Sequence, residues 1–139
     1  MPAGRSAPPS AAPADDAFLQ YPGSALVVAL LADKWTIPVI HTLARGTRRT
    51  GELKAALAGV SQKMLTQTLR ALEEHGLVER TVYPVVPPRV EYRLTELGAS
   101  INEPLAVLCE WTERHGAQLA RALARRRAAR ARAAAAAER

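Results

Sequence analysis

The apolar residues of this chain change their spacing at a few points, and these changes predict where its helices and strands lie. Residues 24–32 (SALVVALLA) are apolar on almost every side, which predicts a short helix covered on both faces, with Ser24 as its N-cap. Residues 34–45 predict a second helix. Pro38 is tolerated only in the first turn of a helix, so this second helix should begin near Trp35 or Thr36.

Residues 50–76 predict two further helices joined by a tight turn. Thr50 is the expected N-cap of the first of these, whose leucines face inward. Residues 58–60 (AGV) form the turn, and Ser61 caps the next helix over residues 62–75. The order of helix, turn and helix is that of a helix-turn-helix motif.

The chain then changes to an alternating pattern, which predicts a β-hairpin. Residues 77–83 (LVERTVY) and 90–95 (VEYRLT) alternate between apolar and polar side chains, so they form its two strands. Residues 84–89 (PVVPPR) cannot pair regularly, because proline has no N–H to donate. The hairpin should therefore have a stiff tip.

A long helix follows the hairpin, and Thr95 is its expected cap. Pro104 should bend this helix. Residues 125–139 are almost entirely arginine and alanine, which favours helix but offers nothing to bury, so we expect frayed helix or disorder there. Four apolar side chains recur along one face at helical spacing, namely Leu97, Ile101, Leu105 and Leu108.

Together these elements predict a mainly α fold with a small β-hairpin wing (α+β), that is, a winged helix-turn-helix. The second helix of such a module enters the major groove of DNA. Residues 1–16 are rich in Pro, Ala, Gly and Ser, with too little apolar content to offset the entropy of ordering, so we expect disorder. The predicted organisation is a tail over 1–16, a winged domain over 17–124 and an Arg/Ala-rich tail over 125–139.

The second helix of the motif separates its leucines from its polar side chains, which spread over about 140° of the helical wheel. Such polar groups hydrogen-bond to base edges and phosphates. The alternative is a solvated face in which Arg70 pairs with Glu73 or Glu74, beside a wing with an ordinary surface arginine. The candidate DNA-binding residues are Arg48, Arg49, Thr50, Lys54, Ser61, Gln62, Lys63, Thr66, Gln67, Arg70, Pro88 and Arg89.

The charge of the chain is unevenly distributed. The formal net charge is +6, but residues 1–112 carry eleven basic and eleven acidic side chains, whereas residues 113–139 carry eight arginines and two acids. The high net charge is therefore a property of the tail and is no evidence for the winged domain. Within residues 45–93, nine basic side chains outnumber five acidic ones, a surplus that suits contact with phosphates.

Several classes of function lack the residues that they need. The single cysteine, Cys109, excludes an internal disulfide and a cysteine-based zinc site, and we expect it to be a buried packing residue. No histidine has a second ligand at metal-binding spacing, and motifs such as G-x-S-x-G and H-E-x-x-H are missing, so we expect no metal, cofactor or enzyme activity. No apolar run suits a membrane span and no leader opens the chain, so we expect a cytoplasmic protein without a membrane partner.

Four stretches of the chain together resemble one family of regulators. They are residues 34–36 (KWT), 59–67 (GVSQKMLTQ), 69–80 with its Gly-Leu-Val, and 83–98 with its Pro-Pro-Arg-Val-Glu-Tyr. In this order and combination, which covers more than half of the chain, the sequence resembles the HxlR-type winged helix-turn-helix transcriptional regulators. These are relatives of the MarR group.

The resemblance implies a bacterial homodimer that binds double-stranded DNA at a two-fold operator and represses or activates neighbouring genes. Helix 61–75 and wing 84–89 would make the contacts, with half-sites about 10 bp apart. The resemblance also implies dimerisation through the N-terminal helix and the long C-terminal helix, in agreement with their apolar faces. The expected interface residues are Leu26, Leu30, Leu105 and Leu108.

The chain departs from the family in one respect. Several members sense oxidants or electrophiles through a cysteine just before the first helix, where this chain has Tyr21-Pro22. We therefore expect a small apolar or aromatic effector instead of the usual thiol switch. Its pocket would lie between the dimer helices, with a lining that includes Leu31, Trp35, Leu108 and Trp111.

Two alternatives stay open at this point. The winged domain could be a protein-interaction module with little or no specific DNA binding, which the neutral charge of residues 1–112 favours. Nucleic acid could also bind to the arginine tail alone, without sequence preference. Phosphate contacts impose a steep dependence of affinity on salt, whereas a protein interface need not.

Overall fold

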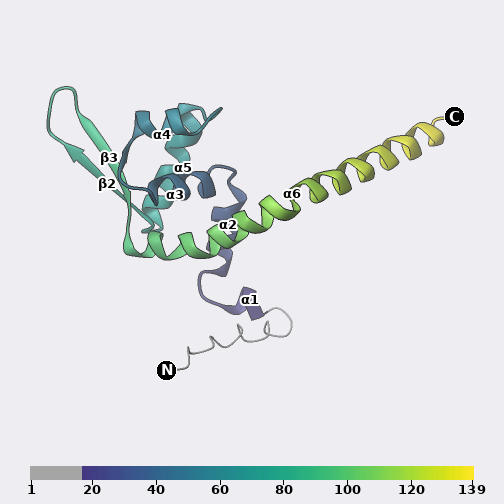
Figure 1. Cartoon of the computed structure of the whole chain (residues 1–139), viewed down its shortest axis with the longest axis horizontal. Helices are drawn as coiled ribbons and strands as arrows, with labels where there is room; N and C mark the ends of the chain where they lie inside the picture. Colours follow the sequence, from purple (N-terminus) through teal and green to yellow (C-terminus); the bar gives the residue numbers. More distant parts are fainter. Residues whose placement is uncertain (1–16) are drawn as a thin grey trace.

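The structure is a computed structural model that describes residues 17–139, so the tail predicted over residues 1–16 lies outside the described residues. Figure 1 shows α3, α4 and α5 grouped beside the hairpin, while α6 leaves this group as one long helix. The prediction of a mainly helical winged helix-turn-helix with a small sheet is confirmed. The elements are α1 (Ala17–Gln20), α2 (Ser24–Ala32), α3 (Thr36–Leu43), β1 (Arg48–Arg49), α4 (Thr50–Ala56), α5 (Gln62–Glu74), β2 (Val78–Tyr83), β3 (Arg89–Leu94) and α6 (Glu96–Ala137).

The predicted hairpin is part of a three-stranded antiparallel sheet in the order β1-β3-β2. β2 pairs with β3, and Tyr83 lies opposite Arg89 at the end that leads into the wing tip. β1 pairs with the other edge of β3, where Arg48 lies opposite Tyr92. The sequence pattern missed β1, because a two-residue strand shows no alternation and exists only through its pairing with β3.

The core lies where α3, α4 and α5 meet the sheet. The leucine face predicted for α5 is buried, with Leu65 and Leu72 at 0% exposure and Leu69 at 1%. From α3, Val39 and Ile40 are also fully buried. Burying a side chain of this size stabilises the fold by about 1.5–3 kcal/mol. This cluster therefore fixes α5 firmly against the rest of the domain.

Two of the predicted helix caps are present. The Ser61 hydroxyl accepts a hydrogen bond from the backbone N–H of Met64 at 3.1 Å, which starts α5. The Thr95 hydroxyl accepts one from the backbone N–H of Gly98, also at 3.1 Å, which starts α6. A cap of this kind is worth about 1 kcal/mol.

The other two predicted caps are wrong by one residue. α2 is preceded by Gly23 in the left-handed region (φ 83°), and the Ser24 hydroxyl donates to the carbonyl of Leu19 at 3.2 Å. Thr50 is the first residue of α4, and the backbone N–H of the residue before it donates to the Glu52 carboxylate at 3.2 Å. In both cases the chain turns one residue earlier than the polar side chain suggested.

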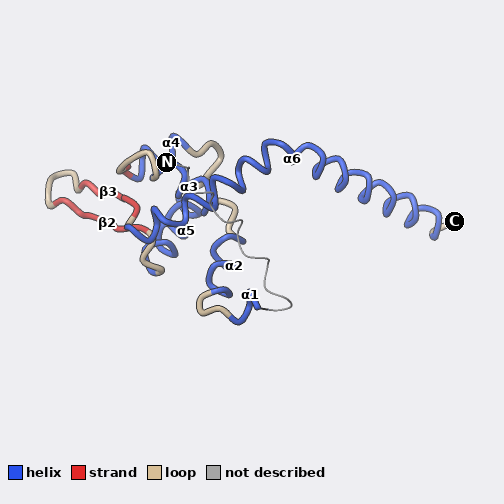
Figure 2. Tube along the Cα trace, turned by 60° about the horizontal axis from the view of Figure 1, so that its bottom comes forward, coloured by secondary structure: helices blue, strands red, loops and turns tan. Residues whose placement is uncertain are grey.

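The two prolines predicted to affect helices lie inside them. Pro38 is the third residue of α3, within its first turn, as expected. Pro104 lies inside α6, which continues without a break to Ala137, so residues 125–137 form regular helix. Figures 1 and 2 show the axis of α6 changing direction before the helix projects away from the domain.

Within residues 17–139, no single helix is long and apolar enough to cross a membrane. α2 and α3 together match a bent span in length and composition, with 94° between them. However, α3 supplies Val39 and Ile40 to the core of the domain, which accounts for its apolar composition.

Candidate nucleic-acid interface

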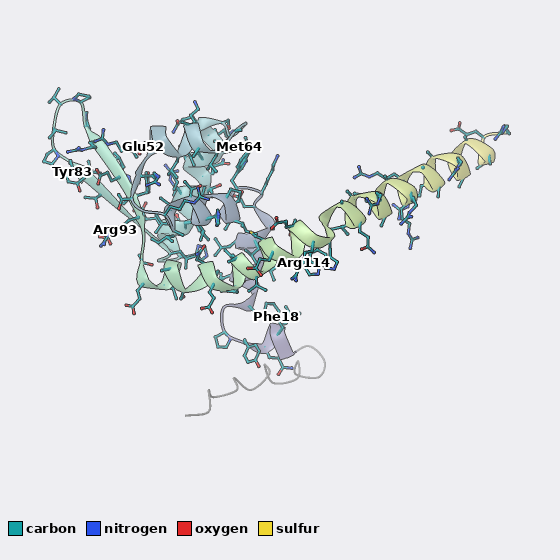
Figure 3. All side chains as sticks on the ribbon, in the orientation of Figure 1. Phe18, Glu52, Met64, Tyr83, Arg93 and Arg114 are labelled. Atoms are coloured by element: carbon teal, nitrogen blue, oxygen red, sulfur yellow. The ribbon has the colours of Figure 1, made fainter. Side chains whose placement is uncertain are left out.

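The polar face predicted for α5 is exposed along its whole length. Lys63, Gln67 and Arg70 lie opposite the buried leucines, and the same face carries Gln62 and Thr66. Gln62 donates a hydrogen bond to the Thr66 hydroxyl at 3.3 Å. In Figure 3, Met64 marks the outer side of this helix, next to α4.

Arg70 does not make the ion pair that would explain it as a solvated surface residue. Among residues 17–139, the ion pairs are Arg89 with Glu91 and Arg93 with Glu79. The side chains of Lys63, Gln67 and Arg70 have no hydrogen-bond or ion-pair partner in this part of the chain. These side chains are therefore available for base edges and phosphates.

A buried polar contact that the sequence did not reveal holds α5 in place. Thr68, at 1% exposure, donates a hydrogen bond to the Asp33 carboxylate at 2.9 Å. The other oxygen of that carboxylate accepts from the backbone N–H of Trp35 at 2.8 Å. Asp33 thus ties the junction of α2 and α3 to the face of α5 opposite its polar residues. No local pattern marks a contact across 35 residues, although a threonine among the buried leucines is a hint.

The wing arginine is held in place by neighbouring side chains. The Arg89 guanidinium lies 4.9 Å from the centre of the Tyr83 ring. Its Nε atom lies 3.9 Å from one Glu91 oxygen, and the Tyr83 hydroxyl donates to the other at 3.2 Å. The Nε of Arg89 is buried and lacks a hydrogen-bond partner within the described residues. Arg89 begins β3, so it lies at the base of the tip and not at its end.

The end of the wing is apolar. Val86 is fully exposed and Val85 is 46% exposed. Proteins that enter the minor groove often insert apolar side chains there. Only Pro88 and Arg89 of this loop were predicted from the sequence to contact DNA, although two valines flanked by prolines at a hairpin tip were a visible signal.

The structure brings the wing next to the start of α4. Arg49 and Thr50 line a hollow of about 300 Å³ together with Pro88 and Arg89. β1 pairs with β3, so residues some 40 positions apart in the chain share one surface. Arg48 is turned away from this hollow, since its guanidinium donates to the carbonyl of Thr47 at 3.0 Å.

The remaining predicted DNA-binding residues lie outside the hollow between the wing and α4. Lys54 is exposed in the last turn of α4, and Ser61 is occupied as the cap of α5. Arg80 on β2 was not predicted, yet it lines a hollow of about 310 Å³ with Thr66 and Arg70. Only the register of the hairpin against α5 places Arg80 beside the polar face.

The predicted dimer residues divide into two groups. Leu30 and Leu105 are 8% and 5% exposed and belong to the core of their own chain, so they are not free for a partner. Leu26 and Leu108 are 53% and 43% exposed. An apolar hollow of about 440 Å³ lies between α2 and α6, and Leu26 is part of its lining.

The residues predicted for an effector pocket lie in different surroundings. Leu31 and Trp35 pack against the core. Leu108 and Trp111 are exposed on α6, where the indole ring stacks on His115 with 5.1 Å between ring centres. These four side chains therefore do not line one common pocket in the single chain.

The prediction that Cys109 is a buried packing residue is wrong, because this side chain is exposed. Leu105 is the last buried residue of α6, and beyond it the helix leaves the domain. Helical periodicity assigns a residue to a face, but it does not show where the neighbouring elements stop covering that face.

The fold and this surface define a transcriptional regulator with a helix-turn-helix DNA-binding domain. The chain belongs to the HxlR-like helix-turn-helix family, whose model matches residues 30–120. It is 44% identical over 87 residues to the uncharacterized HTH-type transcriptional regulator YtfH of Escherichia coli K12, covering 63% of this chain and 69% of that one.

Two solved structures extend this comparison. One is described as a MarR-family transcriptional regulator from Enterococcus faecalis V583, with 38% identity, a TM-score of 0.62 and coverage of 81% of this chain and 99% of that one. The other is the redox regulator HypR in its reduced form, with 34% identity, a TM-score of 0.64 and coverage of 68% and 94%. The chain is therefore similar to MarR-type regulators in fold as well as in sequence.

Proposed function

We propose that this protein is a dimeric, sequence-specific DNA-binding transcriptional regulator that binds a two-fold operator through α5 and the wing. The observation that carries the proposal is the exposed polar face of α5, which lies opposite a fully buried leucine face and on which Lys63, Gln67 and Arg70 have no partner within residues 17–139. A helix fixed in this way can present the same side chains to the same base edges at each encounter. Its target would be chromosomal DNA, so the protein would act in the bacterial cytoplasm.

The residues divide into two roles by their chemistry and position. The polar residues of α5 from Gln62 to Arg70 would contact base edges, because glutamine offers a donor and an acceptor to adenine and arginine donates two hydrogen bonds to guanine. The hollow between wing and α4 would hold the DNA backbone, with Arg49 and Thr50 on one side and Pro88 and Arg89 on the other. Lys54 would add a phosphate contact beside it, while Arg48, which is turned away from this hollow, would contact a phosphate outside it.

Dimerisation would cover the apolar surface that the single chain leaves exposed on α2 and α6. Leu26, Leu97 and Leu108 are each more than 40% exposed, and the hollow between the two helices reaches from Leu26 to Leu97. A second copy in two-fold arrangement would bury this surface and place the two α5 helices on one side of the duplex.

We further propose that the input is a small apolar or aromatic effector. The relative HypR is a redox regulator, but this chain has Tyr21-Pro22 before α2 and a single cysteine at position 109. The effector would bind between the dimer helices, near Leu31, Trp35, Leu108 and Trp111. None of these four residues lines the apolar hollow between α2 and α6, but that hollow reaches His75, the C-cap residue of α5. An effector that extended into the hollow would alter DNA binding by favouring one position of α5.

Selection of genomic DNA fragments by the purified protein at about 150 mM salt tests the function, because non-specific phosphate binding is weak under these conditions. We expect enrichment of an inverted repeat whose half-sites lie about 10 bp apart. Fragments without a shared sequence would contradict specific binding. A change in thermal unfolding by a ligand, without a change in operator affinity, would contradict its role as effector.

The second candidate is a protein-interaction module that makes little use of DNA. The equal number of acidic and basic side chains over residues 1–112 favours it. In that case the affinity for a partner protein would depend weakly on salt. The affinity of residues 17–112, without the arginine-rich segment, for duplex DNA would also show no steep dependence on salt.

A further inference from the structure

We propose that the distal part of α6, residues 114–137, is a second DNA-binding element. We call this segment the arm. It would contact phosphates outside the half-site bound by α5 and the wing of the same chain. The proposal extends the proposed function and rests on it only in taking duplex DNA as the partner. The family model ends at residue 120, so most of the arm lies beyond the part that the chain shares with its family.

The arm carries a high positive charge that nothing in the described structure neutralises. It contains seven arginines, and no acid lies between Glu113 and Glu138. All seven side chains are exposed. Within residues 17–139 the ion pairs involve Arg89 and Arg93, which belong to β3. The arm therefore presents its full charge to solvent or to a polyanion.

Four of these arginines lie in a line along one face of the helix, a set that we call the arginine stripe. Their spacing of seven, four and seven residues keeps them within about 40° of one another on the helical wheel. The first and last are 18 residues apart, which corresponds to about 27 Å along the helix. The members of the stripe are Arg114, Arg121, Arg125 and Arg132.

The arm is helical for reasons that do not require it to pack on anything. α6 is anchored at Leu105, which is 5% exposed, so the helix extends from an existing nucleus and needs no new one. Alanine, the strongest helix former, fills most of the remaining positions. The arm can therefore hold its arginines at fixed spacing while it stays in solvent.

The composition of residues 124–137, the outer part of the arm, favours nucleic acid over a protein or a membrane as its partner, whereas the inner part also carries the exposed Leu119 and Leu123. Residues 124–137 contain only arginine and alanine. Protein interfaces depend on a few large buried side chains, and membrane-surface helices depend on a bulky apolar face, neither of which this segment has. A guanidinium group, in contrast, makes paired hydrogen bonds to phosphate oxygens. The chemistry that remains is contact with a regular row of phosphates.

The position of the arm determines which phosphates it can reach. Figure 1 shows the wing and the end of α6 at opposite ends of the longest axis of the molecule. In Figure 3, Arg114 lies where the helix leaves the domain, so the remaining arginines lie farther out. The arm therefore cannot share the base pairs that the wing of its own chain contacts, and it would add a separate stretch of backbone to the complex.

The test compares two triple variants that lose the same charge from different faces. One is Arg121→Gln with Arg125→Gln and Arg132→Gln, which removes most of the arginine stripe. The control is Arg126→Gln with Arg127→Gln and Arg130→Gln, whose side chains lie on the other side of the helix. Glutamine and arginine have similar helix propensity, so circular dichroism should show equal helicity for both variants.

The measurement is the affinity for duplex DNA as a function of salt, on duplexes that extend at least about 10 bp beyond both half-sites. For the stripe variant we expect the slope of log affinity against log salt to fall by about 2.7 for each engaged arm, since each lost phosphate contact contributes about 0.9. With this difference in slope, the ratio of wild-type affinity to variant affinity should fall about 40-fold between 50 and 200 mM salt. The loss should be equal on operator and scrambled duplexes, and the control should lose less than one unit of slope.

Three results would overturn the proposal. Unchanged slopes in both variants would show that the arm does not touch DNA. Equal losses in both would show a diffuse charge effect without a binding face. A change of oligomeric state in the stripe variant, measured by analytical ultracentrifugation, would make the arm an interface between copies. Failure of the proposed function looks different, because the wild type would then show no preference for any sequence while the slope on scrambled duplex still tests the arm.

Discussion

α5 and the arm are both exposed helices with basic side chains, yet they differ in what fixes their position. α5 buries four side chains on its inner face and is tied to Asp33 through Thr68. The arm buries none of its side chains. Base edges differ from one position to the next, whereas phosphates repeat along the whole duplex. A helix with a fixed position can therefore supply specificity, while a helix without one can supply only affinity.

Removing a buried leucine of α5 should produce the largest difference in stability between a variant of α5 and a matched variant of the arm. Leu69→Ala should lower the free energy of unfolding by about 2–5 kcal/mol, because it leaves a cavity under the helix. The matched change on the arm is Leu119→Ala, at a residue that is 60% exposed. It should change stability by less than about 0.5 kcal/mol in urea unfolding. A large loss at Leu119 would show that the arm is packed on a partner and would break the comparison.

The buried hydrogen bond to Asp33 should have the next largest effect. Thr68→Val keeps the shape of the side chain but leaves the carboxylate without one partner, which should cost about 1–3 kcal/mol of stability. Since α5 would lose its tie to the α2–α3 junction, operator affinity should fall more than affinity for scrambled DNA. Thr66→Val, on the exposed face, is the stability control. Equal stability of the two variants would contradict the positioning role of Asp33.

The exposed face of α5 can be tested for base contact at one residue. Gln67→Ala should weaken binding to the cognate operator by about 1–3 kcal/mol and relax the sequence preference at its base pair. Binding titrations on the operator and on single base-pair variants give this difference directly. If the same loss appears on every sequence, then Gln67 contacts the backbone and does not supply specificity.

The wing should show the smallest effect. Arg89→Ala should weaken binding to all sequences alike and reduce the slope of log affinity against log salt by about 0.9 per subunit. Arg93→Ala is the control, because this arginine lies on the same strand but is paired with Glu79. A change of slope at Arg93 as large as that at Arg89 would mean that the wing holds no special phosphate contact.

Local patterns in the sequence predicted the parts of the fold that depend on neighbouring residues. The caps at Ser61 and Thr95, the leucine face of α5 and the hairpin all depend on residues within one or two turns or strands of one another. The same patterns failed for Cys109, which is exposed, and for Leu30 and Leu105, which are buried in their own chain. Periodicity shows that a face is apolar, but it does not show what covers that face.

By itself the sequence determined that a polar, basic helix follows a tight turn and precedes a proline-tipped hairpin, because helix periods, caps and turns are local properties. Only the tertiary structure decided that Arg49 lies beside Arg89, that Asp33 accepts a hydrogen bond from Thr68, and that α6 continues beyond the domain as the arm. Each of these depends on residues far apart in the chain, or on where neighbouring elements end. Such contacts follow from the packing of the whole domain, so they cannot be predicted from a short segment of the sequence.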